Sequence, residues 1–195
     1  TLLSPLTLPN GVVLQNRILM GSMHTGLEGH SIPPWVDRLV LGENNPHGTD
    51  LSRMAQYMAE RASAGIIVTG GIAPNIAGWV GPFAAKLTTI QERDGHSQVT
   101  EAVHSANPDA KICMQILHAG RYAYHPLAVS SSATKSPISP FKARALTESG
   151  IAQTVQDYVT CASLAEQAGY DGVEVMGSEG YLISQFLCRR TNHRK

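Results

Sequence analysis

A repeated alternation of short apolar segments with helix-like segments constrains the fold of this chain more than any other feature. The strand-like segments, rich in Ile, Val, Leu and Met, cover residues 17–23, 66–69, 111–117 and 171–176. Helices are predicted over residues 51–64, 96–105, 147–168 and 182–187. Strands separated by helices pair in parallel, because a right-handed crossover places a helix between neighbouring strands. The chain is therefore predicted to be an α/β protein.

Two parallel architectures fit this order of elements: an open doubly wound sheet and a (β/α)₈ barrel. A complete barrel takes ~250 residues, whereas this chain has 195, and the pattern alone leaves both architectures open. Before the first unit, residues 6–14 predict a β-hairpin with a type I′ turn at Asn10-Gly11. Residues 29–50 are rich in Pro, Gly and Asn and predict an inserted loop, and residues 72–95 and 119–147 also predict loops.

Composition excludes several classes of function. Lys and Arg total 15 and Asp and Glu total 15, so the zero net charge argues against a nucleic-acid or membrane-surface binder. No apolar run reaches the ~18 residues of a membrane span, and residues 1–5 do not resemble a signal peptide. Cys113, Cys161 and Cys188 form no C-x-x-C pair. We therefore expect no metal site and a reducing compartment, the cytoplasm or, in a eukaryote, the mitochondrion.

Unusual residues mark the carboxyl ends of the predicted strands, where parallel α/β folds build their sites. They are, in chain order, Ser22, Met23 and His24, then Gly70 and Gly71, then Gln115, and finally Tyr181. Gln115 is the most informative, because a buried amide needs partners for both its donor and its acceptor. A planar heterocycle with donors and acceptors would satisfy this amide, and so would the backbone edge of a neighbouring strand.

Four sequence blocks together resemble a known family. They cover residues 16–28, 68–74, 115–122 and 168–187, and residues 190–194 extend the last block. In these blocks the chain is similar to the old yellow enzyme family of flavin-dependent oxidoreductases, and most similar to its bacterial-type 2,4-dienoyl-CoA reductases. The resemblance implies a (β/α)₈ TIM barrel, represented here by the N-terminal hairpin, which acts as a lid, and by roughly the first four β/α units.

The resemblance also implies an FMN site across the carboxyl-terminal mouth of the barrel. The residues that it assigns to flavin contact are Ser22, Met23, His24, Gly71 and Gln115. Gln115 would bind the pyrimidine edge of the ring, and the missing Cβ of Gly71 would permit close approach.

Catalytic and substrate-binding roles follow from the same resemblance. Tyr181 corresponds to the proton donor, since a phenol with a pKa of about 10 is protonated at neutral pH while the reduced flavin gives hydride. The acyl-CoA or other unsaturated carbonyl substrate would contact Thr191, Asn192, His193 and Arg194. The signature residues His118, Gly120 and Arg121 are expected to be mainly structural.

Several parts of the family pattern fall beyond residue 195: strands five to eight, the loops for the FMN phosphate, a substrate-side histidine, the cysteines of a 4Fe-4S cluster, and a domain for NADPH and FAD. The leading hypothesis is an FMN-dependent reductase of 2,4-dienoyl-CoA thioesters, driven by NADPH, of which these residues are the N-terminal half. The alternatives are an enone reductase or amine dehydrogenase of the same family, and a non-catalytic truncated fragment.

Overall fold

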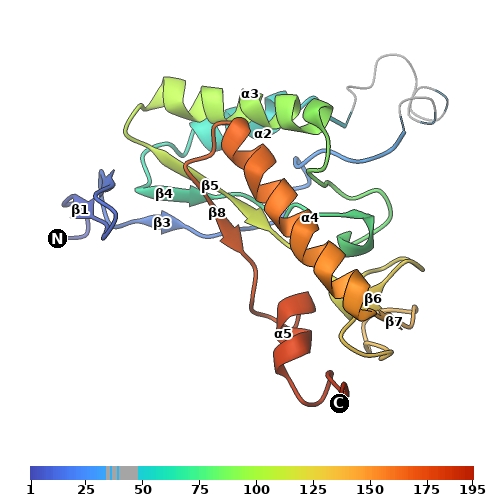
Figure 1. Cartoon of the computed structure of the whole chain (residues 1–195). Helices are drawn as coiled ribbons and strands as arrows, with labels where there is room; N and C mark the ends of the chain where they lie inside the picture. The colour runs from blue at the N-terminus through green and yellow to red at the C-terminus, as the bar shows by residue number, and fades with distance from the viewer. Residues whose placement is uncertain (34–35, 37–38, 40–47) are drawn as a thin grey trace.

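The computed structural model describes residues 1–33, 36, 39 and 48–195, and a four-stranded sheet lies at its centre (Figure 1). The strands are, in spatial order, β3 (Leu19–Met20), β4 (Ile66–Val68), β5 (Lys111–Ile116) and β8 (Gly172–Val175). Each neighbouring pair is parallel, which confirms the predicted α/β class. The described residues close no barrel: β3 and β8 form the two edges of this sheet.

Three helices pack on one face of the sheet: α2 (Ser52–Ala59), α3 (Ile90–Ala106) and α4 (Glu148–Gln167) (Figure 1). The core lies between these layers. Its fully buried members include Met54, Met58, Ile67, Val99, Val103, Ile112, Met114 and Ile116. Alternate residues of β5 point to the helices, so the intervening position 115 faces the other side of the sheet. The short helix α5 (Leu182–Leu187) follows β8.

The longest helix, α4, begins and ends where the sequence predicts. Thr147 Oγ1 accepts a hydrogen bond from the backbone N–H of Gly150 at 3.0 Å, which caps the first turn. After the helix, Gly169 adopts a positive φ of 89°, a conformation that ends helices and favours glycine. The chain therefore passes from α4 through a short turn into β8.

Two other helices differ from their predicted limits. α3 begins at Ile90, within a segment predicted to be a loop, because Thr89 and Glu92 form a reciprocal capping box. Gly95 lies inside this helix, where a Cβ would collide with the backbone oxygen of Thr49, so close packing explains the glycine. α2 ends at Ala59 and not at residue 64.

The predicted loops contain short elements. Ile76–Gly78 and Gly120–Tyr122 form 3₁₀ turns, and β6 (Val129–Ser130) pairs with β7 (Arg144–Ala145). The predicted inserted loop at residues 29–50 falls mostly outside the described residues. None of the described helices combines the length and the hydropathy needed to cross a bilayer.

The predicted N-terminal hairpin is confirmed, but its turn type is wrong. β1 (Leu6–Thr7) and β2 (Val13–Leu14) pair antiparallel, at the end of the sheet where β3 starts (Figure 1). A type I′ turn at Asn10-Gly11 needs a positive φ at both of these residues, and Asn10 does not adopt one. Gly11 instead donates its N–H to Leu8 O at 2.9 Å and alone takes a positive φ of 85°, the pattern of a three-residue loop with a bulge.

Candidate functional site

Gln115 lies at the centre of the candidate site, on β5, with its side chain only 3 % exposed. Its Nε2 donates to Ser22 Oγ at 2.6 Å and to Glu174 Oε2 at 3.2 Å, and lies 3.4 Å from Met176 Sδ. Ser22 follows β3, two strands away on one side, whereas Glu174 and Met176 come from β8 and its continuation on the other. The amide therefore joins the carboxyl ends of the parallel strands.

Gly71, which follows β4, lies directly against Gln115. A Cβ at position 71 would be 2.7 Å from Leu117 Cβ and 3.0 Å from Gln115 Oε1. The Gln115 backbone N–H also donates to Thr69 Oγ1 at 3.2 Å, which binds this part of β5 to the end of β4. The structure thus brings together Ser22, Gly71 and Gln115, three of the residues that the sequence assigned to flavin contact.

Glu28 fixes the loop that carries Met23 and His24, and sequence analysis did not single it out. Its carboxylate accepts from the backbone N–H of Thr25 at 2.7 Å and from that of Gly26 at 3.0 Å, although the residue is only 7 % exposed. Such bonds immobilise a turn that has no regular secondary structure. The available signal was an acidic residue three positions after a threonine that starts a turn.

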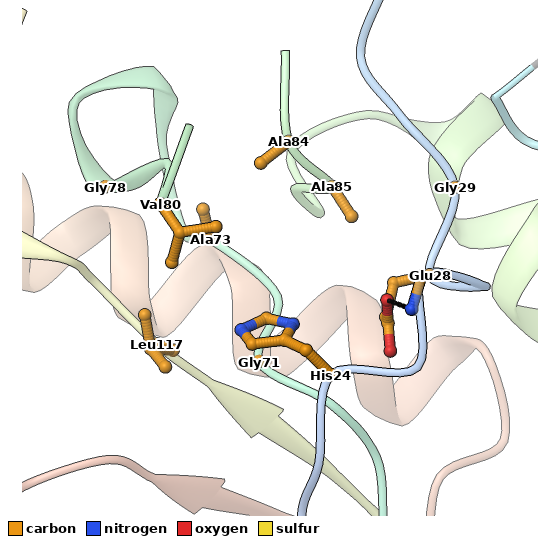
Figure 2. Close-up of a pocket in the computed structure, with 11 residues that line it drawn as sticks. His24, Glu28, Gly29, Gly71, Ala73, Gly78, Val80, Ala84, Ala85 and Leu117 are labelled. Atoms are coloured by element: carbon orange, nitrogen blue, oxygen red, sulfur yellow. Dashed lines mark hydrogen bonds between the residues drawn. The ribbon is translucent and has the colours of Figure 1, made fainter. Parts of the chain in front are cut away.

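A cavity of about 180 Å³ opens beside this loop (Figure 2). It is lined by His24, Gly26, Glu28, Gly29, Gly71, Ala73, Gly78, Val80, Ala84, Ala85 and Leu117. Figure 2 shows the His24 imidazole projecting toward the opening between Leu117 and Glu28. Small side chains and glycines dominate the wall, so the cavity offers backbone and apolar surface to a flat ligand. Met23 is half exposed and accepts a weak bond from Tyr57 Oη at 3.7 Å.

Tyr181 is positioned by a tight turn after β8. Glu179 and Gly180 both adopt positive φ, 61° and 83°, and the Tyr181 N–H donates to Ser178 O at 3.3 Å. The ring packs edge-on against Tyr122, with centroids 5.8 Å apart, and contacts the cluster that includes Leu117 and Met176. Burial raises the pKa of the Tyr181 hydroxyl, with the nearby Glu179 charge adding to the shift, so the phenol is protonated at neutral pH.

The signature residues His118, Gly120 and Arg121 make internal contacts. His118 is 1 % exposed, its Nδ1 accepts from the Gly120 N–H at 3.1 Å, and burial lowers its pKa to about 3. The Arg121 N–H donates to Gln185 Oε1 at 3.0 Å, which joins this turn to α5. His118 is therefore a neutral, buried side chain that stabilises the turn formed by the residues that follow it.

The predicted substrate residues at 191–194 lie apart from the cavity wall and hold the end of the chain. Thr191 Oγ1 donates to Gln185 O at 2.9 Å, and the His193 N–H donates to Ser132 Oγ at 2.8 Å. Asn192 Nδ2 donates to Phe186 O at 2.7 Å, and Arg194 donates to Leu146 O at 2.6 Å and pairs with Glu148. The structure does not bring these four residues together with Gln115.

Glu174 is the second residue of the site that sequence analysis missed. The available signal was one acidic residue between two valines in a predicted strand, at a position that pairs in register with Gln115. Within the described ranges, no group of three or more His, Cys, Asp or Glu residues gathers in a way that could hold a metal ion.

Comparison with known proteins identifies relatives over the whole chain. Residues 1–195 match the model of the NADH:flavin oxidoreductase / NADH oxidase family. The chain is 34% identical over 191 residues to a metal reductase of Desulforamulus reducens, covering 93% of this chain and 25% of that protein. It is 28% identical over 192 residues to an NADPH dehydrogenase of Halalkalibacterium halodurans, covering 94% of this chain and 50% of that protein.

Solved structures show the same similarity. Morphinone reductase in complex with tetrahydroNAD superimposes with a TM-score of 0.82 at 26% identity, covering 100% of this chain and 54% of the other. An old yellow enzyme homologue from Zymomonas mobilis gives a TM-score of 0.80 at 28% identity, covering 100% of this chain and 53% of the other. The chain therefore spans from a quarter to about half of the length of these relatives.

Proposed function

Because this chain belongs to the NADH:flavin oxidoreductase / NADH oxidase family, we propose that it contributes the ring-binding side of an FMN-dependent NAD(P)H oxidoreductase. The observation that carries the proposal is the buried Gln115 amide beside Gly71, at the carboxyl end of four parallel strands. We also propose that these strands are half of a (β/α)₈ barrel. The full-length superposition on proteins about twice as long supports this view.

The residues present fit a flavin ring. Gln115 Oε1 accepts no hydrogen bond from the described residues, although its side chain is almost fully buried. An amide acceptor left open in this way can bind a donor, and the flavin pyrimidine ring offers an N–H. Gly71 leaves free the space that a Cβ would fill next to this oxygen. Ser22, Met23 and His24 would complete the set of flavin contacts from the end of β3.

Bound FMN would supply hydride transfer between the nicotinamide and the substrate. Tyr181 would then supply the proton from its Oη to the neighbouring carbon of the substrate. The raised pKa of this hydroxyl keeps the proton in place at neutral pH until the substrate takes it. The packing of the ring against Tyr122 restricts its orientation, which general-acid catalysis requires.

The substrate that we propose first is a 2,4-dienoyl-CoA thioester, with NADPH as reductant. Only the resemblance of the block 177–181 supports this choice. The second candidate is another unsaturated carbonyl compound, such as a cyclic enone, and relatives named 12-oxophytodienoate reductase 7 and morphinone reductase favour it. FAD and a 4Fe-4S cluster would belong to residues beyond 195, and a cytoplasmic location stays a prediction.

Titration with FMN tests the cofactor assignment. The flavin-free form of the full-length flavoenzyme is titrated while flavin fluorescence and the visible absorption band are followed, and saturable quenching with a shifted band is expected. The isolated 195-residue chain should not hold FMN tightly, because it supplies the ring-facing residues and not the phosphate-binding loops. Gln115→Ala should weaken binding by about 1–3 kcal/mol, because it leaves the pyrimidine edge without its buried partner. The matched control is Gln156→Ala, which removes an exposed amide on α4. Equal affinity in Gln115→Ala and the control would remove Gln115 from the site.

A further inference from the structure

The carboxylate of Glu174 lies next to the Gln115 amide because of strand register. In the parallel pair β5 and β8, Gln115 is the register partner of Glu174. Partners in register project on the same side of a sheet, so both side chains lie on the face opposite the helices. The result is the hydrogen bond of 3.2 Å from Gln115 Nε2 to Glu174 Oε2.

The partners of Gln115 determine which way its amide points. A carboxylate accepts hydrogen bonds and cannot donate one, and the thioether sulfur of Met176 also only accepts. Both lie near the same terminal atom of Gln115, at 3.2 and 3.4 Å. The hydroxyl of Ser22 can donate or accept, so it suits either orientation. The charged partner, Glu174, therefore contributes most to placing Nε2 on its own side.

This orientation leaves the carbonyl of Gln115 for the ligand. Oε1 lies on the Gly71 side of the amide, where the ideal Cβ of residue 71 would be 3.0 Å away. Because Nε2 already donates to protein acceptors, Gln115 offers only its Oε1 acceptor to a ligand that lies over Gly71. A ring with an N–H at this point is bound, and a ring without one leaves a buried carbonyl unpaired.

We infer that Glu174 is a positioning residue that orients the Gln115 amide, so that the site selects a flavin ring by its N3–H. This inference rests on the proposed function. It assigns Glu174 an indirect role, through Gln115, and no contact with the ring. Selection here follows from leaving a polar partner unsatisfied, which discriminates more strongly than a change in apolar fit.

A flavin methylated at N3 tests the inference, since the methyl group removes the N–H donor. FMN and N3-methyl-FMN are titrated into the flavin-free full-length flavoenzyme and into its Glu174→Gln and Glu166→Gln variants, with quenching of flavin fluorescence as the readout. The unaltered full-length protein should prefer FMN about 10- to 100-fold. In Glu174→Gln the preference should fall to within about threefold, because the new amide can donate to Oε1 and allow Gln115 to turn over.

The control Glu166→Gln removes an exposed carboxylate on α4 and should keep the full preference. If Glu174→Gln loses its circular dichroism, Glu174→Asp gives the same readout, since it keeps the charge but withdraws it from Gln115. An unchanged preference for FMN in the position-174 variant overturns the inference and leaves the proposed function intact. A full-length protein that shows no saturable FMN binding overturns both.

Discussion

Gly71 lies so close to the Gln115 amide that a Cβ on residue 71 would be 3.0 Å from Oε1. The same Cβ would be 2.7 Å from Leu117 Cβ, so no side chain fits here unless β5 moves. The missing side chain keeps the acceptor edge of the amide uncovered. This relationship between the ends of β4 and β5 leads to the first prediction.

Gly71→Ala should weaken FMN binding about tenfold or more and lower the free energy of unfolding by about 1–3 kcal/mol, because the methyl group overpacks the space next to Leu117. Fluorescence titration and urea denaturation measure the two effects. Gly81→Ala is the matched control, since a Cβ there meets no atom within 4 Å. Unchanged FMN affinity in Gly71→Ala would show that the ring does not approach this backbone.

Tyr181→Phe should slow substrate reduction by about 10²–10⁴-fold, the usual contribution of a general acid. The variant keeps the ring that packs on Tyr122 and removes only the hydroxyl. Reduction of the flavin by the nicotinamide should stay nearly normal. Stopped-flow measurement of the two half-reactions in the full-length flavoenzyme separates these steps. If both rates stay within a few-fold, Tyr181 is a packing residue and the proton comes from another group.

Thr89→Ala should lower the free energy of unfolding by about 1 kcal/mol, because it removes the hydroxyl that caps α3. The hydroxyl accepts from the Glu92 N–H at 3.3 Å, and Glu92 Oε2 accepts from the Thr89 N–H at 3.1 Å. Ser105→Ala, near the other end of the same helix, serves as the control. An equal stability for both variants in urea would contradict the capping role.

Stability should fall as the pH drops below 6.5. Burial lowers the pKa of His96 from 6.5 to about 4, and its Nδ1 lies 2.8 Å from Tyr170 Oη. Between these two values the unfolded chain binds a proton at His96 that the folded chain does not. A histidine whose pKa is lowered in this way therefore reduces the free energy of unfolding by up to about 1.4 kcal/mol for each unit that the pH falls.

Urea denaturation at several pH values checks this prediction. In His96→Gln the slope of stability against pH should decrease by the equivalent of nearly one proton. Gln156→Ala, which replaces an exposed residue that does not titrate, should keep the slope of the unaltered chain. An identical slope in all three proteins would show that His96 is protonated in the fold.

The four parallel strands were predictable because each is a short segment rich in Ile, Val, Leu or Met that alternates with a helix-like segment. Ile112, Met114 and Ile116 are all fully buried against the helical layer. The start of α3 was missed although Thr89 and Glu92 have the Thr-x-x-Glu spacing of a capping box, which marks a helix N-terminus in a sequence. What the sequence does not show is the packing of Gly95 against the backbone of Thr49, because that contact exists only in the folded chain.

The candidate site was only partly predictable, for a similar reason. Gln115 stands out in the sequence, since an amide inside an apolar strand requires an explanation. Glu174 does not, because its importance depends on the register between β5 and β8. Glu28 was missed because its contacts with Thr25 and Gly26 need a folded loop. The roles predicted for Thr191 to Arg194 stay predictions.

The register between β5 and β8 also determines which insertions and deletions leave the site intact. Side chains alternate between the two faces of a strand, so deleting one residue inside β8 would turn the Glu174 carboxylate toward the helices and bring a valine next to Gln115. A deletion in the surface loop before α4 changes no strand pairing in the sheet. Among homologous sequences, insertions and deletions should therefore occur in the loops and not within residues 172–175.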